Sequence, residues 1–271
     1  MNALFSGILV IALSNSTPIT YDENSFIAGY SVYAEANYAQ THKIWTQLAN
    51  QNDARAQYGL AVMYEFGQGV PHDYTQAAYW YKRAAKLDYA MAKNNLGMLY
   101  EKGLGVPPSL DMAIDYYRQA AEQGLASSQY NMGLMHYDGI GVKQDAAQAW
   151  SWFYKAALQD FAPAQYNLGL MYQRGDGTET NHVEAARWYI QAINTGASKA
   201  YSGLQALLRD KEAAPTAQQL ILRQQPNASA DIISQIPSGD LVYTLDRKEN
   251  WVAILTQDQK TLGWVELPAS Q

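Results

Sequence analysis

The sequence contains no cysteine, and basic residues are scarce. The absence of cysteine excludes a disulfide framework and a thiolate metal site, and it is compatible with an oxidising compartment. The 19 Lys and Arg residues stand against 25 Asp and Glu, for a formal net charge of −6. No cluster of Lys and Arg overrides this balance. Because nucleic-acid phosphates require a basic face, the charge argues against nucleic acid as a partner.

Long hydrophobic runs are also missing, apart from Leu4 to Leu13. This run is too short to span a bilayer but fits the hydrophobic part of a secretory signal, and small residues follow at Ala12, Ser14 and Ser16. No Lys or Arg precedes it. We expect residues 1–20 to be a signal segment, cleaved or retained in the membrane, and the protein to be periplasmic or secreted without a transmembrane span. The alternative is a buried N-terminal helix.

The chain lacks recognised catalytic and metal-binding motifs. Its four histidines lie in different parts of the sequence without a partner at ligand spacing, and no serine nucleophile elbow is present. His136 occupies a position held by tyrosine in the other copies of a repeat described below, so packing is its expected role. Two carboxylates that converge in space would not be visible in the sequence. We expect no enzymatic activity, no cofactor and no metal.

What the sequence has is a repeat with a period of 36 residues. Four copies begin near Ala54, Ala90, Ala126 and Ala162, and a truncated fifth copy extends to about residue 210. A fixed period of this size is typical of a stacked array, in which each unit buries its apolar face against the next. Nearly half of the residues are hydrophobic, which favours a globular chain.

Each copy reads as two helices. A glycine pair after the first helix predicts a left-handed C-terminal cap, and its place after a helix argues against a phosphate-binding loop. Asp53 is expected to cap the first helix of the first copy. Small residues mid-helix suggest that two helix backbones approach closely; they are Ala61, Gly97, Gly133 and Gly169. The expected caps of the second helices are Asp73, Asp111, Asp145 and Asn181.

The flanking segments have a different pattern. Residues 21–53 predict a capping helix pair with a turn near Asn37, in which Tyr30, Tyr33 and Ala34 pack on Ile44, Trp45 and Leu48. Residues 211–217 read as a linker. Short strand-like runs separated by turn residues fill 218–271 and predict a small closed β-barrel. Because about fifty residues is near the lower limit for independent stability, we expect the barrel to dock on the last helices.

The repeat resembles the Sel1-like family, a relative of tetratricopeptide repeats. The resemblance rests on Tyr166-Asn-Leu-Gly-Leu-Met-Tyr172, Gly103-Leu-Gly-Val106 and Trp152-Phe-Tyr-Lys-Ala-Ala157, and it covers residues 54–208. It implies an α/α solenoid, a right-handed superhelix of antiparallel helix pairs with the first helices on the concave face. Family members mostly serve as adaptors and scaffolds. The expected copies are 54–89, 90–125, 126–161, 162–197 and the partial copy 198–210.

The C-terminal segment looks like a bacterial SH3 domain. The carrying residues include Ser238-Gly239-Asp240, Asn250-Trp251-Val252 and Gly263-Trp264-Val265. Such domains in envelope proteins often bind peptidoglycan or peptides, but the usual Asn-Val-Arg-Ser-Gly-Pro opening is degraded here to Leu222-Arg-Gln-Gln-Pro226. Tyr243, Trp251 and Trp264 could form a ligand groove. Equally, Trp264 could belong to the core and Trp251 could dock on the solenoid.

By analogy with tetratricopeptide repeats, two registers of the first helices would face a protein partner. The first holds Tyr58, Asn94, Tyr130 and Tyr166, and the second holds Glu65, Glu101, Tyr137 and Gln173. Tyrosine suits protein recognition because it combines contact area, a polar tip and little rotamer entropy. The alternative is that these positions are family consensus with packing roles.

The leading functional hypothesis is a non-enzymatic scaffold of the bacterial cell envelope that holds a protein in the concave groove. A second is an inhibitor or immunity-type protein that blocks a secreted toxin or wall hydrolase. A third is a peptidoglycan-targeting module that regulates a hydrolase. An acidic groove would favour a basic partner over an anionic wall polymer.

Overall fold

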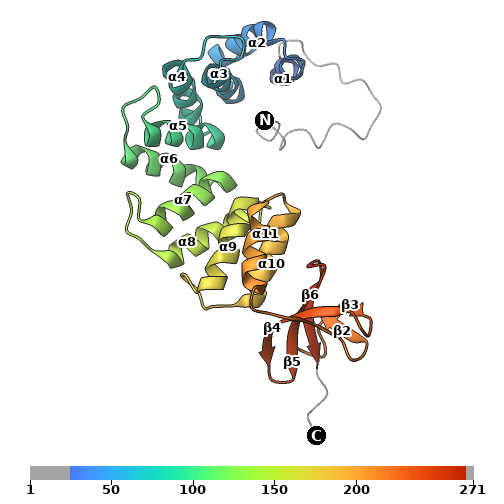
Figure 1. Cartoon of the computed structure of the whole chain (residues 1–271). Helices are drawn as coiled ribbons and strands as arrows, with labels where there is room; N and C mark the ends of the chain where they lie inside the picture. Colours follow the sequence, from blue (N-terminus) through green and yellow to red (C-terminus); the bar gives the residue numbers. More distant parts are fainter. Residues whose placement is uncertain (1–24, 267–271) are drawn as a thin grey trace. The chain divides into compact units, whose positions relative to one another are not determined.

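The computed structural model describes residues 25–266, so the predicted signal segment lies outside the described residues. Within this range the chain forms eleven α-helices followed by six β-strands (Figure 1). It divides into two compact units, one containing residues up to 92 with 104–106, and the other containing 93–103 with 107 onwards.

The first unit contains four helices around the buried Trp45. They are α1 (Phe26–Ala34), α2 (Tyr38–Asn50), α3 (Ala54–Phe66) and α4 (Tyr74–Lys86). The Trp45 ring stacks on Phe26 at 5.6 Å and on Tyr33 at 5.4 Å between centroids. Gly29 and Gly59 make room for it, since a Cβ on either would lie within 2.6 Å of the indole. The predicted contacts of Tyr30 and Tyr33 with this core form, whereas Ala34 is exposed.

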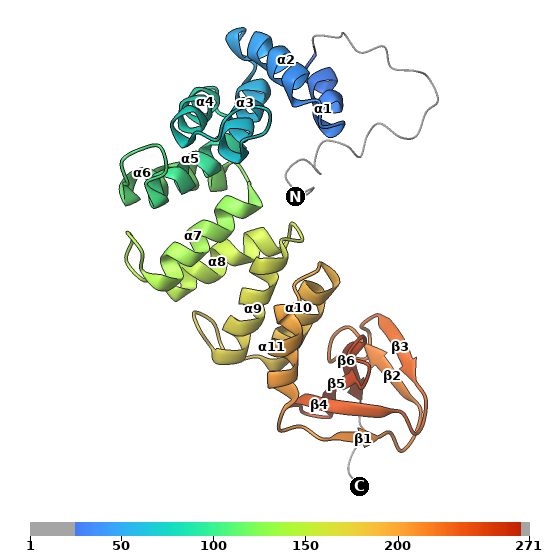
Figure 2. The same ribbon diagram turned by 45° about the horizontal axis from the view of Figure 1, so that its top comes forward.

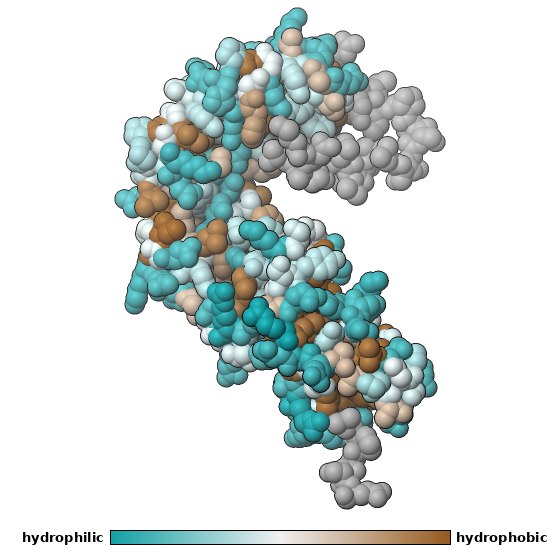
Figure 3. Space-filling view, in the orientation of Figure 1, coloured by the Kyte–Doolittle hydropathy of each residue, from teal (hydrophilic) through white to brown (hydrophobic). Residues whose placement is uncertain are grey.

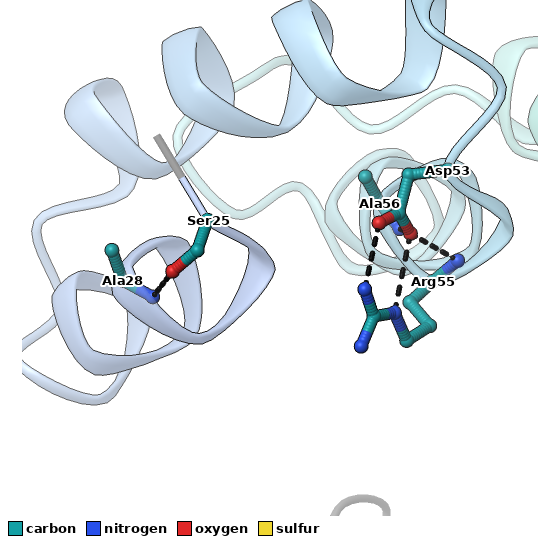
Figure 4. A network of polar contacts seen from close by, with 5 residues as sticks. All are labelled: Ser25, Ala28, Asp53, Arg55 and Ala56. Carbon is teal, nitrogen blue, oxygen red and sulfur yellow. Dashed lines mark hydrogen bonds and ion pairs between the residues drawn. The ribbon is translucent and has the colours of Figure 1, made fainter. Parts of the chain in front are cut away.

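Asp53 caps α3 as expected. Its Oδ1 accepts hydrogen bonds from the backbone N–H groups of Arg55 at 2.9 Å and Ala56 at 3.1 Å, and its Oδ2 lies 2.9 Å from the Arg55 guanidinium. Figure 4 shows this carboxylate between the helix terminus and the arginine, with the equivalent Ser25 cap of α1 nearby. Burial acts to raise the pKa of Asp53, but hydrogen bonds from Arg55 and Ala56 outweigh it and lower the pKa.

The cap therefore predicts a pH-dependent stability. Asp53→Ala is expected to lower the free energy of unfolding by about 1 kcal/mol at neutral pH, mostly through the lost cap because the Arg55 pair is half exposed. A depressed folded pKa stabilises the protein above the unfolded value, near 3.9, and this stabilisation is lost as the pH falls through the folded pKa. Urea unfolding should therefore show a smaller difference in the free energy of unfolding between the wild type and Asp53→Ala at pH 3 than at pH 7. Asp53→Asn, which keeps a side-chain oxygen as the hydrogen-bond acceptor of the cap, is the control. If the wild type and Asp53→Ala differed equally at both pH values, the charge of Asp53 would make no contribution to stability.

The second unit begins with seven helices, which are three sequential pairs and the single last helix α11. They are α5 (Ala90–Lys102, whose first turn belongs to the first unit), α6 (Leu110–Glu122), α7 (Ala126–Asp138), α8 (Ala146–Ala157), α9 (Ala162–Arg174), α10 (His182–Asn194) and α11 (Lys199–Leu208). The glycine caps form as predicted: Gly139 and Gly175, like Gly67 in the first unit, adopt left-handed backbone angles at the ends of their helices.

The predicted cap of α6 was wrong. Ser109, not Asp111, is the N-cap residue, and its Oγ accepts from the backbone N–H of Met112 at 3.3 Å. Ser109 lies one repeat after Asp73 and one before Asp145, so the period itself identifies the cap. Asp111 lies in the first turn instead, where its negative charge is favourable near the helix N-terminus.

The small residues in the middle of the first helices make room for aromatic rings rather than for another helix backbone. A Cβ on Gly133 would lie 2.5 Å from the Phe153 ring, and one on Gly169 would lie 2.6 Å from the Tyr189 ring. Both rings are almost completely buried. At Gly133 and Gly169 the predicted backbone approach is thus replaced by a ring from the second helix of the same repeat, whereas a Cβ on Gly97 would lie 3.0 Å from the Tyr117 ring and 3.2 Å from the backbone oxygen of Ala113 in α6.

Buried glutamines at the start of the first helices connect successive repeats. Gln129 Nε2 donates to the carbonyl of Ala121 at 3.2 Å, and Gln165 Nε2 donates to that of Ala157 at 3.2 Å. Gln57 makes the same bond to Ala49 in the first unit, at 3.0 Å. Each of these carbonyls lies in the last turn of the preceding helix and also accepts a hydrogen bond from a backbone N–H group of the turn that follows.

The C-terminal strands form one antiparallel sheet in the order β1-β4-β5-β6-β2-β3 (Figure 2). They are β1 (Ala213–Pro215), β2 (Leu220–Arg223), β3 (Ile232–Ile236), β4 (Leu241–Lys248), β5 (Trp251–Thr256) and β6 (Leu262–Glu266). The segment predicted as a linker differs from expectation, because Ala213–Pro215 pairs with β4 and thereby extends the sheet.

The sheet packs against α10 and α11, as its small size led us to expect. Along β5 the alternate residues Val252 and Ile254 belong to the core of the sheet, whereas Trp251, Ala253 and Leu255 belong to a cluster shared with the helices. This cluster includes Leu204 and Leu207 of α11. A strand buried on both faces requires a continuous apolar run, and Trp-Val-Ala-Ile-Leu supplies it.

The truncated fifth repeat ends the array at this contact. Gln205 occupies the register of Gly169, and the small residue of α11, Gly203, receives the Tyr189 ring of the preceding helix α10. No second helix of this repeat follows within residues 25–266, and Leu204, Leu207 and Leu208 of α11 share one buried cluster with Trp251, Ala253 and Leu255 of the sheet. The domain therefore acts as the C-terminal cap that an array of this kind requires.

Candidate functional site

The first predicted register is partly exposed in the second unit. Tyr130 of α7 and Tyr166 of α9 are half-buried. The Tyr130 ring lies 5.6 Å from that of Phe153 and 5.4 Å from that of Phe161, and the Tyr166 ring lies 6.0 Å from that of Tyr189. We call Tyr130, Tyr166 and their neighbours Asn131 and Asn167 the α7–α9 face. Each tyrosine ring packs against aromatic neighbours, and part of its surface remains exposed to solvent.

A polar network continues this register onto α5. The Asn94 Oδ1 atom accepts hydrogen bonds from Ser128 Oγ at 2.8 Å and from Asn131 Nδ2 at 3.2 Å. Burial raises the pKa of the Tyr130 hydroxyl, while a hydrogen bond with Asn167 acts in the opposite direction. The hydroxyl and amide groups of this face can both donate and accept hydrogen bonds.

Tyr58, the member of this register in the first unit, lies elsewhere. It is 1% exposed and packs between the rings of Tyr81, at 5.6 Å, and Tyr89, at 5.4 Å. A side chain so enclosed has no surface to offer a partner. Among the four predicted residues of the register, Asn94, Tyr130 and Tyr166 thus come to the surface, and Tyr58 belongs to the core.

The second predicted register holds hydrogen-bond acceptors for buried tyrosines. Glu101 Oε2 accepts from the hydroxyl of Tyr117 at 2.7 Å, and Gln173 Oε1 accepts from that of Tyr189 at 2.6 Å. Glu65 makes the same bond with Tyr81 in the first unit and is itself buried. Burial, and then the neighbouring Glu101 carboxylate, raises the pKa of Tyr117, so its hydroxyl stays protonated and donates.

The third repeat shows why the register varies. Its second helix carries Phe153, which has no hydroxyl, and the acceptor position is occupied by Tyr137. The Tyr137 hydroxyl instead donates to Asp176 Oδ2 at 2.8 Å. Sequence reasoning missed this role, although the joint change from tyrosine to phenylalanine and from Glu or Gln to tyrosine was a readable signal.

The predicted groove of the sheet domain is occupied by the helices. Trp251 and Trp264 are buried in the cluster with α10 and α11, and Tyr243 packs against its edge. Of the two alternatives, docking is therefore the one observed for Trp251, and Trp264 belongs to the same shared cluster. These three residues do not form an open groove.

The described residues can be compared with the ligand sets of metal sites and with membrane-spanning helices. Residues 25–266 contain no group of three or more His, Asp or Glu residues placed to hold a metal ion. None of the helices in the same range is both long and apolar enough to cross a bilayer. On the face shown in Figure 3, hydrophobic residues form scattered patches among hydrophilic ones.

Two family models match the sequence. The Sel1 repeat matches at residues 54–89, 90–125, 126–161 and 162–196, and the Bacterial SH3 domain matches at 219–269. Together, the four repeat matches cover more than half of the chain. Their boundaries agree with those expected from the period, apart from one residue at the end of the fourth copy.

Several solved structures are similar. A Sel1 repeat protein from Oxalobacter formigenes is 30% identical with a TM-score of 0.62, and the match covers 67% of this chain and 75% of that one. A protective antigen of uropathogenic Escherichia coli is 35% identical with a TM-score of 0.63, over 67% of this chain and 40% of that longer one. An immunity protein from Pseudomonas aeruginosa is 22% identical with a TM-score of 0.45, over 64% and 68%.

No protein with a curated description matches the chain significantly. The fold, the family models and the similar structures nevertheless agree on the architecture. The repeat array is a protein-interaction scaffold of a kind that is generally non-enzymatic, and bacterial SH3 domains can bind peptidoglycan or peptides. The chain is a member of the Sel1 repeat family that carries a C-terminal bacterial SH3 domain.

Proposed function

We propose that this protein is a non-enzymatic scaffold of the bacterial cell envelope that binds a protein partner through the α7–α9 face. The observation that supports this most directly is the pair of partly buried tyrosines, Tyr130 and Tyr166, each packed against an aromatic ring of the second helix of its repeat. Tyrosines are enriched among residues that dominate binding energy, since they provide area and a polar tip.

The face needs little ordering before it binds. Each tyrosine ring is packed on a buried neighbour, and Asn131 is hydrogen bonded to Asn94. Immobilising a flexible side chain at an interface costs about 0.5–1.5 kcal/mol, and a preformed face avoids much of that cost. The formal net charge of −6 favours a partner with a basic surface, because complementary charge increases the association rate.

The envelope location rests on the apolar run from Leu4 to Leu13, and the absence of cysteine is compatible with it. Fractionation of the producing cells, with the full chain tagged at its C-terminus, tests it. We expect the tagged protein outside the cytoplasm, in the periplasmic, secreted or membrane fraction. Recovery in the cytoplasmic fraction alone would reject the envelope assignment while leaving the binding face open to the next experiment.

Binding is tested with the full chain as bait in an extract of the producing organism, followed by affinity measurement for the protein retained. Replacing Tyr130 and Tyr166 together by alanine should weaken binding at least tenfold, about 1.4 kcal/mol. The matched control replaces Tyr79 and Tyr201, which are 51% and 56% exposed and lie outside the face. Circular dichroism verifies folding of both variants.

The result also separates the functional hypotheses. Equal affinity of the face variant and the control variant would reject the α7–α9 face. Inhibition of a captured toxin or hydrolase by the wild-type chain would make the scaffold an inhibitor. Retention by sedimented peptidoglycan alone, without a protein partner, would reject protein binding and make the chain a wall-targeting module.

A further inference from the structure

A pocket lies between α10 and the SH3-like sheet, and none of its lining residues belongs to the α7–α9 face. Its volume is about 270 Å³. Glu184 and Arg187 line it from α10, and Trp264 lines it from β6. Gln224 and Pro226 of the β2–β3 connection and Lys248 at the end of β4 contribute to the same lining; we call this the junction pocket. It exists only because the sheet docks on the helix.

The charged groups of the junction pocket are unequally matched. Arg187 Nε lies 3.3 Å from Glu184 Oε1, but the Nε atom is buried and has no hydrogen-bond acceptor with suitable geometry in residues 25–266. Lys248 Nζ lies 5.7 Å from the centroid of the Trp264 ring. The pocket lining thus holds two cations and one carboxylate, and the Arg187 Nε–H group is a donor that residues 25–266 leave unused.

This composition favours a ligand with one negative charge. Arginine and lysine bind carboxylates through charge-assisted hydrogen bonds, and the excess of one positive charge matches a single carboxylate. The apolar surfaces of Val183, Pro226 and Trp264 can contact an aliphatic group beside it. The amide side chain of Gln224 can both donate to and accept from a peptide bond.

The size of the pocket favours the end of a peptide ligand over a continuous segment in the middle of one. Pockets for drug-sized ligands measure about 300–1,000 Å³, so this volume accommodates a residue or two rather than a folded element. We propose that the junction pocket binds the C-terminal residue of a peptide, with its α-carboxylate between Arg187 and Lys248 and its side chain against Trp264. This site is composite: the helix supplies Arg187, and the sheet supplies Lys248 and Trp264.

The test measures binding of trialanine and of its C-terminal amide to the full chain by isothermal titration calorimetry. We expect the free acid to bind at least tenfold more tightly than the amide, and to raise the unfolding temperature because it contacts both the helix and the sheet. Acetate and inorganic phosphate are titrated in parallel. An acetate affinity equal to that of trialanine, or tighter binding of phosphate, would overturn the peptide assignment.

Matched substitutions locate the site. Arg187→Gln and Lys248→Gln should each weaken trialanine binding at least tenfold. Lys260→Gln removes the same charge from an exposed position of the sheet domain outside the pocket lining, and it should leave binding unchanged. Lys248 is exposed, so its variant remains informative even if Arg187→Gln perturbs folding. Equal binding of acid and amide, no binding of either, or equal effects of Lys248→Gln and Lys260→Gln would overturn the proposal.

Discussion

Replacing Trp251 by alanine is expected to destabilise the sheet domain and the last helices together. The indole is 7% exposed and lies in the cluster that contains Leu204 of α11 and Tyr189 of α10. Removing a buried tryptophan side chain costs about 3–5 kcal/mol through lost burial and the cavity that remains. Because the cavity would open at the contact between sheet and helix, both elements lose a shared part of their core.

Thermal unfolding followed by circular dichroism in the helical and strand regions measures this effect. The unfolding temperature of both signals should decrease in Trp251→Ala, whereas Tyr201→Ala, which removes a 56% exposed aromatic residue from α11, should change little. A variant in which only the strand signal moved, with the helices unaffected, would contradict the role of the domain as a cap of the repeat array.

Gly133→Ala is expected to destabilise α7, although alanine is the better helix former by about 1 kcal/mol. The new Cβ would lie 2.5 and 2.6 Å from two atoms of the Phe153 ring, which is 1% exposed. Overpacking a buried core costs about 1–3 kcal/mol, so the clash should exceed the gain in propensity. Gly97→Ala provides a graded comparison, because its nearest ring atom would be 3.0 Å away.

A double-mutant cycle with Phe153→Leu tests the cause. Leucine removes the ring that the new Cβ would meet, so Gly133→Ala should cost less in the Phe153→Leu background than in the wild type. Urea unfolding of the four proteins gives the interaction free energy. If Gly133→Ala lowered the free energy of unfolding equally in both backgrounds, contact with the Phe153 ring would not be the reason for glycine at this position.

Much of the fold could be predicted from the sequence because it repeats. The period identifies equivalent positions, and glycine at the end of the first helix has one favoured use, which Gly67, Gly139 and Gly175 adopt. Where the prediction ignored the period, it failed: Ser109 and not Asp111 lies in the capping register. The packing of the sheet on the helices could also be predicted from the sequence. A strand with five consecutive apolar residues, Trp251 to Leu255, must be buried on both of its faces.

The candidate site was less accessible to sequence reasoning. A tyrosine in a repeat register can be a core residue or a surface residue, and Tyr58 and Tyr130 occupy one register with different exposure. Only the three-dimensional packing separates them. The acceptors for buried hydroxyls were overlooked because Glu101 and Tyr117 are sixteen residues apart and belong to different helices. The junction pocket combines α10 with β4 and β6, which no local pattern joins.

The most direct test of the scaffold proposal is site-specific photo-cross-linking in the producing organism. A photoreactive phenylalanine analogue is placed at Tyr130, at Tyr166, or at Leu158, which is 63% exposed and lies outside the α7–α9 face. We expect one cross-linked protein of the same mass from both tyrosine positions and none from Leu158. Cross-links from Leu158 but from neither tyrosine position would contradict the assignment of the binding face.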